Sequence, residues 1–203
     1  LAERSMIRQA ITLPTLKLNV VEVDDATVPG ILGSIRRIGV LCGVRERAET
    51  LCSSIRGGLD SVRRRTERLP RRRVLFIVGR TPGRIEDLIA AGRTSYLNEI
   101  IEIAGGVNIM ADAGIAYAKV SMEEILTRDP EVIIDMGEMS RTQGVTESQK
   151  RAVVALWGRY PHLTAVKRRR VFAVASDIFV VPGPRVTEAA RQFGKLIHPE
   201  VEF

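Results

Sequence analysis

Side chains able to bind or transform a ligand gather in a few loop segments of this sequence. Cationic, hydroxyl, aromatic and acidic residues follow predicted strands in segments 80–84, 136–141 and 177–185, and Tyr117 lies between them. Because open α/β sheets bind ligands at the carboxyl ends of their strands, we expect these loops to line one shared site. The candidate ligand-binding residues are Arg80, Thr81, Pro82, Gly83, Tyr117, Asp177, Phe179 and Arg185.

The segment 177–185 is stiffer than an ordinary connection. It contains Pro182-Gly183-Pro184, in which two prolines fix φ while the glycine permits unusual torsions. Two interpretations stay open from the sequence: a shaped ligand-binding loop, or a rigid turn that leads into the last helix.

No catalytic constellation is found in the sequence. It contains no Gly-x-Gly-x-x-Gly, no P-loop, no nucleophile elbow and no Cys-x-x-Cys. His162 and His198 each lie beside a proline near an element end, so we expect surface or helix-end residues and no metal site. Cys42 and Cys52 fall at apolar helical positions, where we expect core thiols too far apart for a disulfide. We therefore expect no enzyme activity and no cofactor.

The composition is that of a globular protein with an excess of positive charge. Of the 203 residues, 45% are hydrophobic, and the formal net charge is +7. No apolar run approaches the ~18 residues of a membrane span. The charge comes largely from arginine runs at 63–65, 71–73 and 168–170, which raise the alternative of a nucleic-acid-binding protein. Aromatic residues make up only 4%, too few for a base-stacking surface, so we favour a solvated surface and no nucleic-acid partner.

One long helix divides the chain. Apolar residues recur every three or four positions over 44–69, which predicts a helix of roughly 35 to 40 Å. Before it we expect a helix over 1–12, a strand over 16–23 and a helix over 29–38 capped near Thr27. Since one strand cannot form a sheet and Leu1 lies inside a predicted helix, we expect a processed or truncated chain.

A complete α/β pattern follows the long helix. Buried strands are predicted over 73–78, 131–135 and 171–175, with a short strand over 108–111. Helices are predicted over 95–104 and 186–197, and two more begin at capping boxes formed by Ser121 with Glu124 and by Thr146 with Gln149. Alternating strands and helices predict a doubly wound α/β sheet.

Several of these segments together resemble a known family. The matching stretches include Val74 to Gly83, Ser95 to Ile100, Ala104 to Asn108, Val120 to Leu126, Asp129 to Ile134 and Pro182 to Arg185. Their order and spacing are similar to the carboxy-terminal lobe of substrate-binding proteins of ABC importers for vitamin B12, iron-siderophores and haem. The resemblance covers about two-thirds of the chain, and 39–69 also resembles the connection between that family's two lobes.

The resemblance implies an α/β fold of two doubly wound lobes joined by a single long helix, with the amino-terminal lobe incomplete. Residues 1–43 would be a remnant of that lobe, 44–69 the interlobe backbone helix, and 70–203 the carboxy-terminal lobe. The ligand would lie in the interlobe cleft. The protein would be exported to the periplasm or cell envelope, peripheral to the membrane.

The resemblance also implies partners and residue roles. A membrane permease and its ATPase would receive the ligand, with Glu3 and Glu123 as the docking glutamates of the two lobes. The favoured ligand is a metal chelate, in particular a corrinoid such as vitamin B12. Tyr117 and Phe179 would offer aromatic faces to it, and Asp177 would bond its polar rim.

Other ligands and another class of protein stay open. An anionic ferric siderophore would use the cationic side chains Arg80, Arg84, Arg141 and Arg185, and haem would use Tyr117 as an axial ligand. The rival class is a nucleotide- or phosphate-binding α/β enzyme domain with 79–83 as its phosphate loop. Pro82 removes one amide donor from that loop, which argues against this reading.

Overall fold

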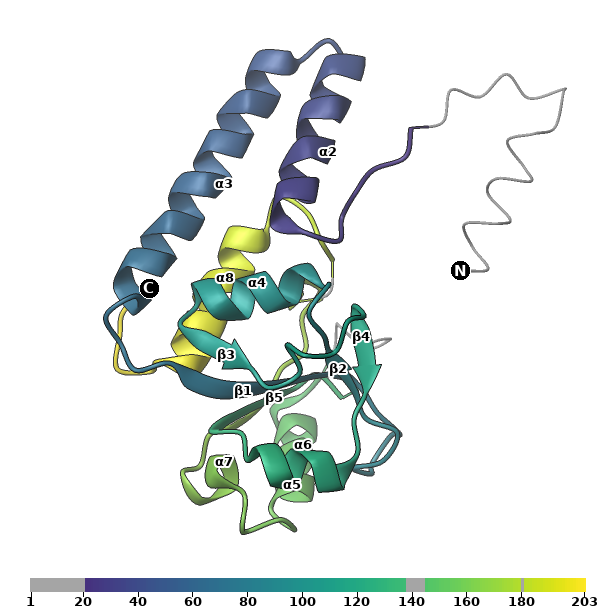
Figure 1. Cartoon of the computed structure of the whole chain (residues 1–203), viewed down its shortest axis with the longest axis vertical. Coiled ribbons are helices and arrows are strands. Elements are labelled where there is room, and N and C mark those ends of the chain that lie inside the picture. Colours follow the sequence, from purple (N-terminus) through teal and green to yellow (C-terminus); the bar gives the residue numbers. More distant parts are fainter. Residues whose placement is uncertain (1–20, 138–144, 180) are drawn as a thin grey trace, which may run out of the picture.

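A mixed sheet lies between two layers of helices in the computed structural model, which describes residues 21–137, 145–179 and 181–203 (Figure 1). The helices α4 (Tyr96–Ile103) and α8 (Val186–Ile197) cover one face. The other face is covered by α5 (Met122–Arg128), α6 (Glu147–Trp157) and α7 (Thr164–Lys167). The predicted α/β fold class is confirmed.

The sheet is parallel at its centre and antiparallel on one side. Its order is β4-β2-β1-β5-β6, and β3 pairs with β1 beside β2. The strands β3 (Gly106–Asn108), β5 (Val132–Asp135) and β6 (Val171–Ala173) run parallel to β1 (Arg72–Gly79) or to one another. By contrast, β2 (Ile89–Ala91) is antiparallel to β1 and to β4 (Tyr117–Lys119). The carboxyl ends of β1, β5 and β6 therefore meet at one edge.

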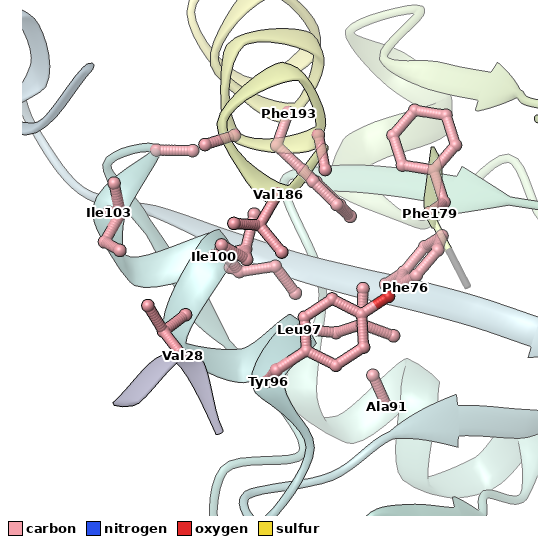
Figure 2. Packing of buried hydrophobic residues seen from close by; sticks show 14 of the residues in the cluster. Val28, Phe76, Ala91, Tyr96, Leu97, Ile100, Ile103, Phe179, Val186 and Phe193 are labelled. Atoms are coloured by element: carbon pink, nitrogen blue, oxygen red, sulfur yellow. The ribbon is translucent and has the colours of Figure 1, made fainter. Parts of the chain in front are cut away.

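The central strand β1 supplies both cores. Val74, Phe76 and Val78 point to the face covered by α4 and α8, while Leu75 and Ile77 point to the opposite face. Successive side chains of a strand alternate between faces, so an unbroken apolar run is what a sheet covered on both sides requires. Figure 2 shows the first face, where Phe76, Phe179 and Phe193 pack together.

Two antiparallel helices project from this domain (Figure 1). Helix α2 (Val28–Leu41) begins at Thr27, whose hydroxyl accepts a hydrogen bond from the Gly30 amide. It ends at Cys42, and Gly43 takes a positive φ of 69°, which glycine adopts without strain. Helix α3 (Arg45–Thr66) then runs back to the sheet, close to the predicted bounds of 44–69.

Helix α3 changes partners along its length. In its first half Ala48 packs directly on Gly39 of α2, and the Cys52 thiol lies 3.5 Å from the Leu32 carbonyl oxygen. From its middle onward it packs on α8, where Gly58 lies against Thr187 and the Thr187 hydroxyl donates to the Ile55 carbonyl at 3.3 Å. The helix thus ties the α2 hairpin to the sheet domain.

Most predicted elements of the sheet domain are present, and some predictions were wrong. The prediction for α8 is confirmed at both ends, while the short strand predicted over 108–111 lies instead at 106–108. The strands β2 and β4 and the short helix α7 were missed. The helix predicted over 1–12 and most of the strand over 16–23 lie outside the described residues, and 21–23 are not a strand.

Local predictions also differ in outcome. The capping box of Thr146 and Gln149 is confirmed, whereas Glu124 forms an ion pair with Arg128 at 2.5 Å and only Ser121 caps α5. Cys52 is buried as expected, but Cys42 is exposed. His198 lies at the end of α8 as predicted, but it is fully buried there, with Nε2 3.3 Å from the Gly105 carbonyl oxygen.

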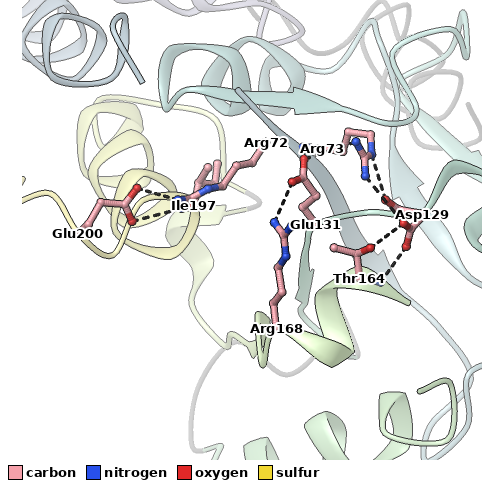
Figure 3. A network of polar contacts seen from close by, with 8 residues as sticks. All are labelled: Arg72, Arg73, Asp129, Glu131, Thr164, Arg168, Ile197 and Glu200. Carbon is pink, nitrogen blue, oxygen red and sulfur yellow. Dashed lines mark hydrogen bonds and ion pairs between the residues drawn. The ribbon is translucent and has the colours of Figure 1, made fainter. Parts of the chain in front are cut away.

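Carboxylates neutralise part of the arginine runs at the amino ends of the strands (Figure 3). Arg72 pairs with Glu200 at 2.7 Å, and Arg73 pairs with both Asp129 and Glu131. Arg168 also reaches Glu131, at 3.2 Å. These arginines hold the chain end and two turns against the sheet, on the side opposite to the carboxyl ends of the strands.

None of the described helices combines enough length with enough apolar character to cross a bilayer.

Candidate functional site

A pocket of about 410 Å³ lies at the edge where β1, β5 and β6 end. Three loops or strand ends contribute to it, together with one side of helix α6. Its lining residues are Arg80, Pro82, Gly83, Asp135, Met136, Gly137, Val145, Gln149, Lys150, Ala152, Val153, Leu156, Ala173 and Val174. Its position is the one at which open α/β sheets bind ligands.

The polar floor of the pocket is a buried ion pair. Arg80, the residue after β1, donates from Nε to Asp135, the last residue of β5, at 3.0 Å. Their side chains are 3% and 0% exposed. Asp135 also accepts hydrogen bonds from the Trp157 indole at 2.7 Å and the Gly137 amide at 2.6 Å. One carboxylate therefore fixes two loops and helix α6 relative to one another.

Arg80 is held on its other side by its own loop. Its Nη1 donates to the carbonyl oxygens of Thr81 at 3.2 Å and Arg84 at 3.1 Å. Gly137 has a positive φ of 69°, and a Cβ there would lie 3.6 Å from Arg80 Nη2. The guanidinium thus closes the bottom of the pocket and directs one remaining nitrogen toward Gly137.

The wall formed by α6 is largely apolar. Val153 and Leu156 face the pocket from this helix, and Val174 and Met136 face it from the strand ends. Lys150 is the cation of this wall, and its Nζ lies 2.7 Å from Glu147 one turn earlier. Such a mixture of apolar surface and a few polar groups is typical of sites for small organic ligands.

Of the predicted ligand residues, only part lies at this pocket. Arg80, Pro82 and Gly83 line it. Thr81 turns away, because its hydroxyl donates to Asp87 at 2.9 Å and its amide bonds the Glu86 carbonyl. The loop 80–84 therefore borders the pocket, while the Thr81 hydroxyl stabilises the turn of the loop instead of facing a ligand.

Asp177 and Arg185 form an ion pair with each other, and neither lines the pocket. Two hydrogen bonds, of 3.1 and 2.6 Å, join the guanidinium to the carboxylate. The hydrogen bond from Arg185 lowers the pKa of Asp177 below its ordinary value, and burial opposes this shift without cancelling it. The pair closes the loop after β6.

The two predicted aromatic contacts lie elsewhere than expected. Phe179 is 4% exposed and packs in the core between Phe76 and Phe193 (Figure 2), so it is not available as an open aromatic face. Tyr117 is exposed, but it begins β4 and pairs with Ala91. It lies at the outer strand of the sheet and away from the pocket, because β2 and β4 insert there as an unpredicted antiparallel pair.

Several residues of the site were missed. Asp135 and Trp157 were predicted only as parts of a strand and a helix, and Lys150 was not singled out. A carboxylate that ends a fully apolar strand is a usable signal, because a buried charge needs a partner. The identity of that partner requires the fold, since Arg80 lies fifty-five residues earlier in the chain.

The structure describes one of the two predicted docking glutamates. Glu123 is exposed in the first turn of α5, and within the described residues it forms no ion pair; Glu3 lies outside those residues. In the part of the chain that the structure describes, no three His, Cys, Asp or Glu side chains gather closely enough to hold a metal ion. Arg141, considered for an anionic ligand, is also outside the described residues.

The chain matches a known protein family over most of its length. The Periplasmic binding protein family matches residues 6–178. The chain belongs to this family. The matched region contains the whole of α3, the six described strands and every described lining residue of the pocket.

Individual members of the family are distant in sequence. The chain is 24% identical to the uncharacterized ABC transporter substrate-binding lipoprotein YvrC of Bacillus subtilis, over 98% of this chain and 60% of that protein. It is 24% identical to the vitamin B12-binding protein of Salmonella paratyphi A, over 91% of this chain and 62% of that protein. The chain therefore spans about three-fifths of the length of these curated relatives.

A solved structure supports the fold. The crystal structure of Staphylococcus aureus IsdE complexed with heme superposes with a TM-score of 0.72 at 18% identity, covering 96% of this chain and 74% of that chain. The family match over residues 6–178 confirms the resemblance seen in the sequence. The structural similarity supports the α/β architecture described above.

Proposed function

We propose that this chain is part of a substrate-binding protein of an ABC importer. It captures a metal chelate, in particular a corrinoid such as vitamin B12, and presents it to a membrane permease and its ATPase. The observation that carries this proposal is the family match over 6–178 together with a pocket at the strand ends of the same region. The family's described members are binding proteins of transporters, which supports a non-enzymatic role.

The proposed division of the chain follows its helices. Residues 1–43 would belong to an amino-terminal lobe, α3 with its flanks over 44–69 would be the interlobe backbone, and 70–203 would form the carboxy-terminal lobe. The change of partners along α3, from α2 to α8, supports this division. The ligand would then be held between the pocket edge described here and the other lobe.

We assign Glu123 to permease docking on the carboxy-terminal lobe and Glu3 to the same role on the other lobe. The exposure of Glu123 near the amino terminus of α5 supports a role in orienting the complex, since exposed charges contribute more to docking than to affinity. Replacing Glu123 by Lys is expected to reduce stimulation of the permease ATPase, with Glu188→Lys on exposed α8 surface as the matched control.

Such a protein works outside the cytoplasm, in the periplasm or attached to the cell envelope. The relative in Bacillus subtilis is a lipoprotein, which supports this location. Detecting an epitope-tagged protein in the secreted fraction or in an envelope extract would test this location.

The decisive experiment is absorbance of the purified product of the complete reading frame after incubation with cyanocobalamin, ferrichrome or haemin and desalting. Retained cyanocobalamin absorbance supports the corrinoid proposal. Retention of ferrichrome or haemin alone would move the assignment to an iron-siderophore or haem carrier of the same family. A folded protein that retains none of them would overturn chelate transport.

A further inference from the structure

Among the described residues, the cations in and beside the pocket lining are matched by carboxylates. Arg80 and Lys150 line the pocket, and Arg185 lies outside the lining, at the start of α8. Their nearest carboxylate contacts are 3.0, 2.7 and 2.6 Å, to Asp135, Glu147 and Asp177 respectively. We call these the paired cations.

Arg80 has the least charge to offer. Its partner Asp135 is fully buried and lies against the guanidinium, so the two charges cancel within the pocket floor. Two carbonyl oxygens occupy Nη1, which leaves only Nη2 near Gly137 for a ligand. Separating a buried ion pair is costly, so an incoming anion would not recruit Arg80 away from Asp135.

The two outer cations stand beside exposed carboxylates. The Glu147 side chain is 74% exposed next to Lys150, and the Asp177 side chain is 37% exposed next to Arg185. A polyanion that approached either cation would also approach its carboxylate, and the repulsion would offset the attraction. The remaining wall is apolar, from Val153, Leu156 and Val174.

We propose that this edge of the site selects an electrically neutral ligand with an apolar face over a polyanionic one. The inference rests on the proposed function and narrows it, because it separates neutral chelates from anionic chelates that the same fold could carry. The basis of this inference is that the paired cations lie beside an apolar wall formed by α6. Nη2 of Arg80 is left to bond a neutral oxygen of the ligand, such as an amide carbonyl.

A tryptophan beneath the pocket provides a reporter. Trp157 bonds Asp135 beneath the pocket, so its fluorescence should be quenched when a chromophoric chelate binds. The probes are cyanocobalamin and ferrichrome, which are neutral, and ferric enterobactin, which is a trianion. We expect the better neutral probe to bind at least about tenfold more tightly than the trianion, with an affinity that changes little from low to high salt.

A charge-unmasking variant tests the cause. Glu147→Gln removes the carboxylate beside Lys150 without replacing a lining residue, and should strengthen binding of ferric enterobactin about twofold to fivefold. Binding of the neutral probe should stay unchanged. Glu86→Gln is the matched control, because its partner Arg84 is exposed and does not line the pocket.

The outcomes separate the two claims. Tighter binding of the trianion by the unmodified protein, or no gain in Glu147→Gln relative to Glu86→Gln, overturns the inference and leaves chelate transport standing. Retention of no chelate by the product of the complete reading frame overturns the proposed function itself.

Discussion

Asp135 is the residue on which the local geometry of the site depends. It is fully buried and bonds Arg80, Trp157 and Gly137, which come from three different segments. Replacing it by Ala leaves the Arg80 guanidinium buried without a counter-charge. We expect Asp135→Ala to lower the free energy of unfolding by about 3–5 kcal/mol, measured by urea denaturation.

The matched control for this prediction is an exposed pair. Arg84 and Glu86 have side chains that are 68% and 59% exposed, so Glu86→Ala should cost no more than about 1 kcal/mol. Equal losses in Asp135→Ala and Glu86→Ala would contradict the role given to the buried pair.

Glu99 makes one part of the stability depend on pH. Burial raises the pKa of this carboxyl above its ordinary 4.5, the hydrogen bond from the Val28 amide opposes the rise, and the charge of Glu102 adds to it. The folded protein therefore binds this proton more tightly than the unfolded chain. The resulting stabilisation is fully present below about pH 4.5 and is lost as the pH rises through the raised pKa.

We therefore expect Glu99→Gln to have a flatter decline of unfolding free energy above about pH 4.5 than the unmodified protein. The glutamine oxygen can still accept the hydrogen bond of the Val28 amide at the start of α2. Urea denaturation at a series of pH values measures the difference. Parallel pH profiles of the two proteins would show that Glu99 titrates alike in both states.

At the level of elements, two adjacent glycines of α3 have opposite roles. A Cβ on Gly58 would overlap the Thr187 methyl group of α8, whereas a Cβ on exposed Gly57 would meet nothing within 4 Å. Alanine favours a helix interior over glycine by about 0.5–1 kcal/mol. We expect Gly57→Ala to raise the melting temperature and Gly58→Ala to lower it.

A double variant identifies the cause of that difference. Thr187 is β-branched and cannot turn its methyl group aside easily. Combining Gly58→Ala with Thr187→Ala should recover part of the loss, beyond the sum of the single changes. Strict additivity would mean that the two helices do not meet at this point.

The sequence predicts the longer elements and those with clear caps, and it misses the short ones. Helices α4 and α8 carry clear apolar faces, and Ser95 caps the first of them as its position suggests. The strands β2 and β4 were missed because each has three residues, too few for an alternating pattern. They are also held by pairing with strands distant in the sequence, β2 with β1 and β4 with β2. Tertiary pairing of this kind leaves no local signal.

For the molecule as a whole, the predicted order of strands indicates where the candidate site lies but not which side chains form it. The loop beginning at Arg80 lies at the pocket, as expected of a loop that follows a parallel strand. The sequence could not reveal that Asp177 would pair with Arg185, or that Phe179 would face the core. Those choices depend on which side chains meet across the sheet.

Binding at this site has a consequence for the stability of the whole protein. A ligand that binds only the folded state stabilises it by about 2.7 kcal/mol when present at a hundred times its dissociation constant. We expect a retained chelate to raise the melting temperature of the product of the complete reading frame. A chelate that is retained without such a shift would be bound equally well by unfolded chains.

Helix α3, which among the described elements packs first on α2 and then on α8, need not exchange its amide hydrogens at one rate. Opening the α2 hairpin exposes the amides near Ala48 without disturbing the sheet, whereas those near Leu59 are released only when α8 and the core separate. A single continuous helix should therefore show rapid deuterium uptake at one end and slow uptake at the other, with the step near Gly58.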